Sequence, residues 1–192
     1  MMKSLTFTLL TLFFLSHVSA QRWLQPIIGA PGTSRVWFYP HANCIGPGIG
    51  CPEVKNGKCC SVGRPNASLH FAPHGRTFLD KLKRMKGCSR MNCEGPCVEG
   101  LSPITCHNGP YAVYSVVIST LGLLGGDNNE ADRIDGEPSG GSQDCEMVSA
   151  VKWLDADGNE VIAKIPEGKL DEVIDATEKN DMNKLMELLD KK

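Results

Sequence analysis

The chain has 192 residues, of which 41% are hydrophobic, 22% charged and 6% aromatic, with 20 Gly, 12 Pro and 9 Cys. This composition excludes a disordered polar chain and a repetitive fibre, and the length predicts one folded domain or one domain with an appendage. The formal net charge of −2 is a sum over the whole chain, and an argument from it about nucleic-acid or membrane partners would mislead.

The first twenty residues have the pattern of a secretory signal peptide. Lys3 provides the positive start, an uncharged apolar run follows from Leu5 to Leu15, and the small residues Ser19 and Ala20 lie where a signal peptidase cuts. The apolar run is shorter than the roughly 20 residues that a membrane anchor needs. We therefore expect a secreted, extracellular protein without a transmembrane anchor, whose mature chain begins at Gln21.

The next segment, residues 21–124, is predicted to be a basic, disulfide-rich β module. Arg35–Tyr39 and Tyr111–Ser119 are rich in aromatic and β-branched residues and predict strands, and Ser68–Phe71 is a weaker candidate. Thr77 can cap a short helix that Gly87 ends. In that helix Phe78, Leu82 and Met85 would share the buried face, whereas the cationic side chains would point outward.

Residues 125–143 are crowded with Gly, Asp, Asn and Ser and predict a flexible acidic linker. Residues 144–192 follow as an acidic segment. There, Val148–Leu154 and Glu160–Ile165 flank an Asp157-Gly158 turn and predict a hairpin, with Trp153 and Ile162 on one face.

Apolar spacing then predicts two short helices, and we expect the hairpin and helices to pack on the β module. The apolar residues of the two helices are Leu170, Val173 and Ile174, followed by Met182, Leu185, Met186 and Leu189. The fold class expected from these elements is α+β.

The two halves of the mature chain have opposite charge. Residues 21–125 contain 11 Lys and Arg against 4 Asp and Glu, whereas residues 126–192 contain 8 against 18. We expect this difference to guide the docking of the acidic segment on the basic module.

All nine cysteines follow the predicted signal peptide, so in an oxidising compartment they predict a disulfide framework. Adjacent Cys59 and Cys60 would make poor disulfide geometry with each other and are expected to hold two different segments. The remaining pairing stays open, and the odd count leaves one cysteine unpaired or intermolecular, so we expect a monomer or a dimer joined through that cysteine. The cysteines are Cys44, Cys51, Cys59, Cys60, Cys88, Cys93, Cys97, Cys106 and Cys145.

Taken together, these features resemble small secreted cysteine-rich proteins of filamentous fungi. The resemblance includes the RVWFY run, Cys44 with Cys51 seven residues later, the adjacent cysteines, Cys106 before a β-branched strand, and a Trp-x-Asp-x-Asp-Gly hairpin after Cys145. Such proteins are candidate effectors. The resemblance therefore implies action on a host, a competitor or a cell-wall partner, and it provides no catalytic residues.

Motifs for metal binding are weak, and we predict neither a metal site nor a cofactor. His70 and His74 have zinc-like spacing, but Pro73 lies between them and interrupts a helical face. His41 and His107 have no fixed relation to them. Residues 155–166 begin like a calcium loop, yet the sixth position is Glu160 and the twelfth is Pro166, so a turn is the better interpretation.

Catalytic motifs are also lacking, because there is no G-x-S-x-G elbow and oxidised cysteines are not nucleophiles. We predict a non-enzymatic binding protein whose partner is an extracellular protein or polysaccharide and not a nucleic acid. The alternative is a membrane-active or antimicrobial toxin that uses the basic segment 76–90. The candidate anion-binding residues of that segment are Arg76, Lys81, Lys83, Arg84, Lys86 and Arg90. Asn66-Ala-Ser68 predicts glycosylation at Asn66.

Overall fold

The computed structural model describes residues 32–75, 77–120 and 145–190. The predicted signal peptide and the predicted linker lie outside the described residues, as does Arg76. Within these ranges the protein is mainly an antiparallel β-sheet followed by two short helices, which confirms the α+β class.

One sheet contains nine strands of the described chain, in the order β5-β4-β6-β3-β1-β2-β8-β9, with β7 beside β3. Neighbouring strands are antiparallel except for β3 and β7, which are parallel. The strands are β1 (Thr33–Tyr39), β2 (Gly48–Lys55), β3 (Cys59–Pro73), β4 (Lys83–Cys88), β5 (Cys97–Leu101), β6 (Cys106–Thr120), β7 (Glu146–Met147), β8 (Ala150–Leu154) and β9 (Glu160–Lys164).

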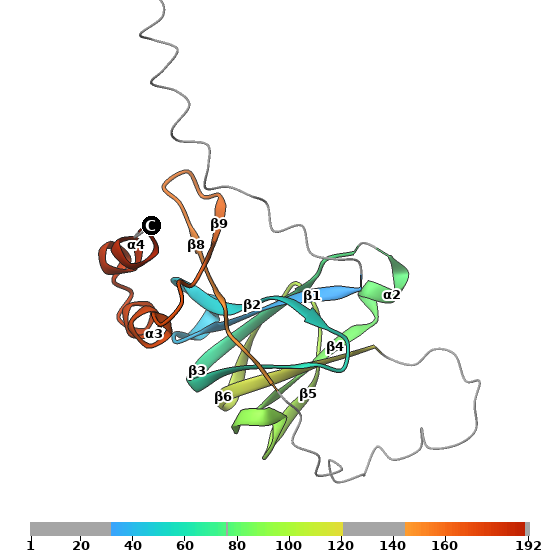
Figure 1. Ribbon diagram of the computed structural model, residues 1–192. Coiled ribbons are helices and arrows are strands. Elements are labelled where there is room, and N and C mark those ends of the chain that lie inside the picture. The colour runs from blue at the N-terminus through green and yellow to red at the C-terminus, as the bar shows by residue number, and fades with distance from the viewer. Residues whose placement is uncertain (1–31, 76, 121–144, 191–192) are drawn as a thin grey trace, which may run out of the picture.

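The helices lie at opposite sides of this sheet (Figure 1). The helices α3 and α4 lie beside β8, β9 and one end of β2, whereas the short α2 lies on the other side. The helical segments are η1 (Ala42–Cys44), α2 (Phe78–Lys81), η2 (Met91–Cys93), α3 (Leu170–Glu178) and α4 (Met182–Asp190).

Strand β1 is buried on both faces. Val36 and Phe38 belong to the main hydrophobic core, whereas Trp37 and Tyr39 belong to a smaller cluster on the opposite face. Because side chains alternate along a strand, the unbroken apolar run requires cover on both sides of the sheet.

The main core extends from the first part of the chain into the last. It joins Phe71 of β3 and Val116 of β6 with Val151 of β8, Val173 of α3 and Leu185 of α4, all with essentially no exposed surface. Full burial of a side chain of this size contributes roughly 1.5–3 kcal/mol. Strand β8 also pairs with β2, so the sheet and the core both continue across residues 121–144 in sequence.

The predicted hairpin and the two C-terminal helices are confirmed. Strands β8 and β9 flank the turn, in which Gly158 has a φ of 81° and the Asp155 carboxylate accepts hydrogen bonds from the amides of Asp157 and Asn159. These bonds hold the tight turn.

The placement of Trp153 and Ile162 on one face was wrong. In the β8–β9 register Trp153 lies opposite Val161, and Ile162 lies opposite Lys152. Paired residues share a face and neighbours alternate, so Trp153 packs on the main core while Ile162 packs on the smaller cluster.

The predicted helix from Thr77 to Lys86 is corrected to one helical turn followed by a strand. The helix α2 ends at Lys81, and β4 pairs with β6 from Lys83 onward. In β4 the side chains of Lys83 and Met85 are buried, while Arg84 and Lys86 between them are half-buried, which is the alternation of a strand. Phe78, expected on the buried face, is 68% exposed.

Candidate functional site

Three cysteines from distant parts of the sequence meet at one place in the fold. Cys59 at the start of β3, Cys93 at the end of η2 and Cys145 just before β7 bring their sulfur atoms within 4.8 Å of one another. The Cys59 sulfur lies within bonding distance of both other sulfurs. Since one sulfur forms one disulfide at a time, the three cysteines hold a single bond and one thiol when oxidised.

The same three sulfurs are the one group within the described ranges whose donors lie close enough together for a metal ion. Three thiolates would suit a soft ion such as zinc. Metal binding requires all three as thiolates, so it excludes the disulfide.

The other six cysteines form three disulfides, each with a single partner. These bonds join Cys44 to Cys106, Cys51 to Cys60 and Cys88 to Cys97. The expectation that Cys59 and Cys60 hold different segments is confirmed, because Cys60 bonds to β2 while Cys59 faces Cys93 and Cys145. A framework of this density fits an extracellular protein.

The Cys44–Cys106 disulfide lies between two turns that neighbouring hydrogen bonds hold in place. Asn43 and Asn108 form two hydrogen bonds with each other. The side-chain Nδ2 of Asn108 donates to Asn43 Oδ1 at 2.7 Å, and the backbone N–H of Asn43 donates to Asn108 Oδ1 at 2.7 Å. The Cys44 N–H donates to Ser68 Oγ at 2.9 Å. These contacts fix Asn43 and Cys44 in the left-handed region, with φ of 61° and 54°.

Each of these two turns presents an exposed isoleucine. Ile45 follows Cys44 and is 62% exposed, and Ile104 precedes Cys106 and is 75% exposed. Ile104 has a φ of 67°, which is unfavourable for a β-branched residue. Its N–H donates to the Phe71 carbonyl at 2.8 Å, which holds the turn on β3. Sequence reasoning missed both residues, because an isolated isoleucine in a turn has no periodic signal.

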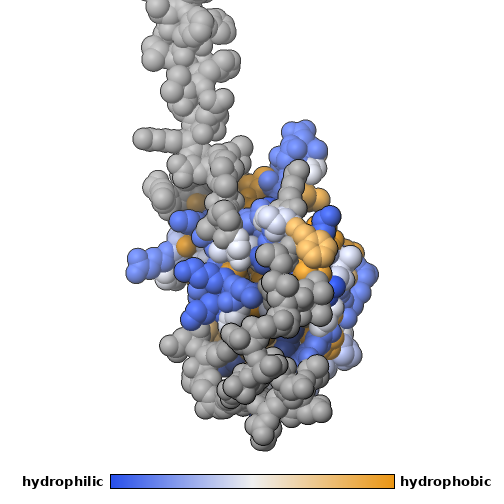
Figure 2. All heavy atoms as spheres, turned by 90° about the vertical axis from the view of Figure 1, so that its right-hand side faces the viewer, coloured by the Kyte–Doolittle hydropathy of each residue, from blue (hydrophilic) through white to orange (hydrophobic). Residues whose placement is uncertain are grey.

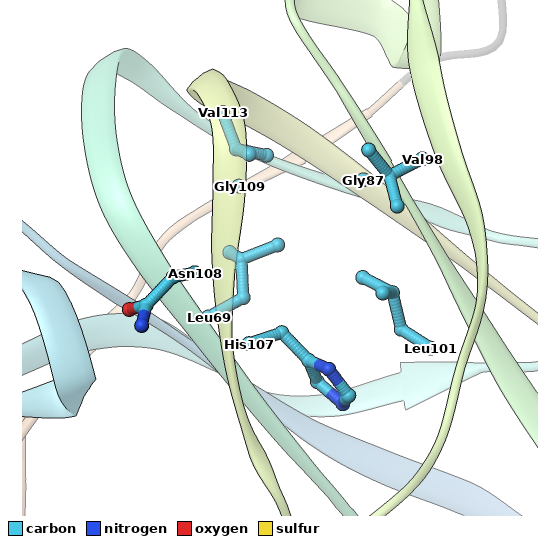
Figure 3. Close-up of a pocket in the computed structure, with 8 residues that line it drawn as sticks. All are labelled: Leu69, Gly87, Val98, Leu101, His107, Asn108, Gly109 and Val113. Atoms are coloured by element: carbon cyan, nitrogen blue, oxygen red, sulfur yellow. The ribbon is translucent and has the colours of Figure 1, made fainter.

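A small hollow lies where β5 and β4 face β6 and β3 (Figure 3). Its cavity volume is about 10 Å³, which is room for about one water molecule and far less than a ligand pocket of roughly 300–1,000 Å³. Leu101 and His107 border it from β5 and β6, while Asn108 points away from it. A Cβ at Gly87 would lie 2.9 Å from Leu69 Cδ1, so this glycine keeps the strands close.

The candidate anion-binding residues do not form one group of free cations. The Lys83 ammonium is buried, Lys86 pairs with Glu99 at 2.6 Å, and Arg84 donates to the carbonyls of Lys81 and Lys83. The expectation that Lys83 points outward is therefore corrected, because this residue occupies an inward position of β4. Anion binding by the remaining residues stays a prediction.

Lys83 instead forms a buried ion pair with Asp80 of α2. Its ammonium lies 3.1 Å from Asp80 Oδ1 and donates to the carbonyls of Gly32 and Thr33. The Asp80 carboxylate also accepts hydrogen bonds from the Thr77 hydroxyl and N–H. These hydrogen bonds from Thr77, followed by that of Lys83, lower the pKa of Asp80.

Figure 2 shows the side of the molecule on which α2 lies, where hydrophobic residues reach the surface as a small patch between hydrophilic ones.

The four histidines considered for zinc have separate structural roles or partners. His70 is half-buried in β3, and its Nδ1 has no hydrogen-bond partner among the described residues. Burial, followed by the charge of Lys152, lowers the pKa of His70 to about 4. His74 Nε2 bonds to the Pro52 carbonyl at 2.7 Å, and His107 Nε2 bonds to the Ser102 carbonyl at 2.7 Å. His41 contributes its backbone carbonyl, which accepts from Ser68.

The predicted glycosylation residue Asn66 is a buried residue of β3 and lies opposite Val113 of β6. Its side-chain amide donates to the Arg64 carbonyl at 3.0 Å. A glycan on this nitrogen would displace the side chain from the folded sheet, and glycosylation stays a prediction.

Comparisons with protein-family models, with curated proteins and with solved structures find no match to this chain. The resemblance to secreted fungal proteins therefore stays a prediction. No helix in the described ranges has the length and apolar character that crossing a membrane requires.

Proposed function

We propose that the protein is secreted and works as a non-enzymatic, effector-like binding protein that recognises an extracellular protein or polysaccharide. The proposal rests on one observation above all, which is the pair of exposed isoleucines on the turns joined by the Cys44–Cys106 disulfide.

Ile104 is unfavourable for the isolated protein in two respects. Its side chain is 75% exposed, and its left-handed φ of 67° places a β-branched residue where Gly or Asn is preferred. Strained backbone positions cluster at functional sites, where the strain has a use. Contact with a partner would remove the exposed apolar surface from water and account for an isoleucine at this position.

The turns are also rigid before any partner arrives. The disulfide, the Asn43–Asn108 pair and the bond from the Ile104 N–H to Phe71 fix the backbone on both sides. A preformed surface loses little conformational entropy on binding, which favours recognition by a small area. The proposed contact surface therefore consists of Ile45 and Ile104 on a fixed backbone.

Binding can be tested with the secreted, oxidised protein and three insoluble or cellular targets: chitin, β-glucan and intact host or competitor cells. We expect saturable retention on one of these targets, and at least a tenfold loss of affinity in Ile104→Asn and in Ile45→Asn. Phe78→Asn is the matched control, because Phe78 is equally exposed but lies on α2, away from the disulfide. Equal retention of all four proteins, or no retention on any target, would contradict the proposal.

The membrane-active alternative is tested in the same preparation by dye release from anionic vesicles. The basic segment forms one helical turn and a strand with a buried Lys83, so it lacks the long amphipathic helix that inserts into a bilayer. We expect no dye release at concentrations that saturate binding. Release that depends on Lys81 and Arg84 would favour the toxin instead.

A further inference from the structure

We propose that Cys59, Cys93 and Cys145 form a thiol–disulfide exchange site, in which the buried Cys59 bonds to one of the two outer cysteines and the other outer cysteine is a reactive thiol. This site is separate from the isoleucine surface and does not depend on the proposed binding function.

The number of cysteines makes a thiol unavoidable in an oxidised single chain. The chain has nine cysteines, and six of them are paired in three disulfides that have no second candidate partner. Three sulfurs remain, all within 4.8 Å of one another. Two can bond, so the third is a thiol adjacent to a disulfide, which is the arrangement that exchange requires.

Cys59 is the cysteine that the two alternative disulfides share. Cys59 is 1% exposed and lies within bonding distance of both other sulfurs, whereas Cys93 and Cys145 are half-buried. The thiol therefore lies on an outer residue in either state, where a small reagent can reach it.

Both outer cysteines stay close to Cys59 without a covalent bond. Beside Cys93, its own N–H donates to Ser115 Oγ at 2.9 Å, and that hydroxyl donates to the Arg90 carbonyl at 2.6 Å, which fixes η2 on β6. Beside Cys145, the strand β7 pairs with β3 at Cys60 and Ser61. Breaking either disulfide therefore leaves the released sulfur in reach of Cys59.

The exchange step needs no external oxidant or reductant. Starting from a Cys59–Cys145 disulfide, the Cys93 thiolate attacks the Cys59 sulfur, the Cys59–Cys93 bond forms and the Cys59–Cys145 bond breaks. The electron pair leaves with Cys145 as a thiolate, which takes a proton from water in place of the one Cys93 lost. The number of disulfides and thiols is unchanged.

The position of the bond changes what is covalently linked. Bonded to Cys145, Cys59 ties β3 to the segment that contains β7, β8 and β9; bonded to Cys93, it ties β3 to the turn between β4 and β5. The thiol that is released is the group that would react with a low-molecular-weight disulfide from outside.

The first test uses the native wild-type protein and counts thiols with the aromatic disulfide DTNB, which itself reacts by thiol–disulfide exchange. We expect one thiol per chain, and none in Cys93→Ser or Cys145→Ser, because each variant leaves Cys59 with one partner. Peptide mapping after acid quenching should find both Cys59–Cys93 and Cys59–Cys145 in wild type. One bond alone, a thiol at any other cysteine, a disulfide-linked dimer, or one bound zinc with three thiolates would overturn the proposal.

The second test asks whether the bond moves. Wild-type protein at about pH 8, where thiolates form, is alkylated with iodoacetamide and separately with iodoacetate over a hundredfold range of concentration. We expect exchange to be faster than labelling at the lowest reagent concentration. In that case the ratio of labelled Cys93 to labelled Cys145 changes at least twofold between the lowest and the highest concentration of one of the two reagents. A ratio that is constant for both reagents would mean two fixed isomers and would overturn exchange.

Discussion

The described ranges before and after residues 121–144 are stabilised by different means. Residues 32–120 contain all three single-partner disulfides and most of the left-handed non-glycine residues. Residues 145–190 contain one cysteine and two short helices, whose apolar faces contribute Val173, Ile174, Leu185 and Leu188 to the core. A chain that turns often on short strands needs cross-links, whereas helices that cover a sheet are held by burial.

The two regions are nevertheless joined by backbone and by charge. Strand β8 continues the sheet at β2, Arg35 pairs with Glu160 at 3.1 Å, and Arg64 contacts three acids of α3, including Asp175. The comparison therefore predicts that stability falls most when a disulfide of the first region is removed and next when a buried side chain of the second region is truncated. Loss of a charged contact between the two regions should lower stability least.

Removal of the longest single-partner cross-link should have the largest effect. Cys44 and Cys106 are 62 residues apart, whereas Cys88 and Cys97 are 9 apart. Since loop-closure entropy grows with loop length, Cys44→Ala with Cys106→Ala should lower the free energy of unfolding by about 4 kcal/mol, and the shorter pair by about 2.5 kcal/mol. Urea denaturation measures both. Equal losses would show that loop entropy does not govern the first region.

Truncation of the helical core should come next. Leu185 in α4 is fully buried, and Leu185→Ala should lower the free energy of unfolding by about 3 kcal/mol. The control on the same helix is Met186→Ala, which changes a residue that is 41% exposed and should cost less than about 0.5 kcal/mol. Similar losses in thermal denaturation would mean that α4 does not depend on the shared core.

Acid should destabilise the folded protein through His70, which lies in β3. Burial holds the pKa of this histidine at about 4, against 6.5 when unfolded, so the unfolded chain binds more protons between these values. The contribution of His70 to the free energy of unfolding is complete above about pH 6.5 and falls as the pH drops toward 4, by up to about 2 kcal/mol between about pH 7 and about pH 5. The charged groups that act on it are Lys152, Glu160, His107 and Arg35.

NMR titration gives the direct readout for His70, and His70→Gln should flatten the pH dependence of unfolding over this range. A His70 pKa near 6.5 in the native protein would mean that the folded sheet does not shield this imidazole from water.

Relief of the strained turn should raise stability. Ile104→Asn replaces a β-branched residue at a φ of 67° with one that tolerates this region, and should add about 1 kcal/mol to the free energy of unfolding. Ile45→Asn is the matched control, because Ile45 is exposed at an ordinary φ of −86° and should change stability little. A loss of stability in Ile104→Asn would mean that the isoleucine side chain stabilises the free protein.

The charged contact across the boundary should have the smallest effect. Arg64→Gln removes an ion-pair cluster that is partly exposed to solvent, so the free energy of unfolding should fall by about 0.5 kcal/mol. This loss should become smaller at high salt, because salt screens exposed charges. Denaturation at two salt concentrations measures this. A loss comparable to that of Leu185→Ala would make charge, and not burial, the principal link between the regions.

Sequence patterns predicted the elements whose own residues specify them. The run Arg35–Tyr39 lies in β1, the run Tyr111–Ser119 lies in β6, and the Asp157-Gly158 turn joins β8 to β9. In each case the local preference and the tertiary environment agree, because β-branched and aromatic side chains are buried in the sheet and Gly158 takes a positive φ.

Elements whose structure depends on pairing with a distant strand could not be predicted from the sequence. The residues Lys83–Cys88 have helical spacing of apolar residues when Phe78 and Leu82 are included, yet pairing with β6 makes them a strand. The three-cysteine site was missed for the same reason, because η2 and β7 lie next to Cys59 only in the folded sheet, where β3 pairs with β6 and β7. The adjacent cysteines signalled two linked segments, but sequence separation could not identify both outer partners.

The placement of β5 and β9 at the two ends of the sheet order bears on self-association. Unpaired strand edges can recruit another copy and grow into fibrils. Here β9 is only five residues long with Glu160 and Lys164 at its ends, and β5 is equally short, with exposed Glu99 and a left-handed Gly100. Short, charged or bent edge strands of this kind should keep the protein free of aggregates at high concentration.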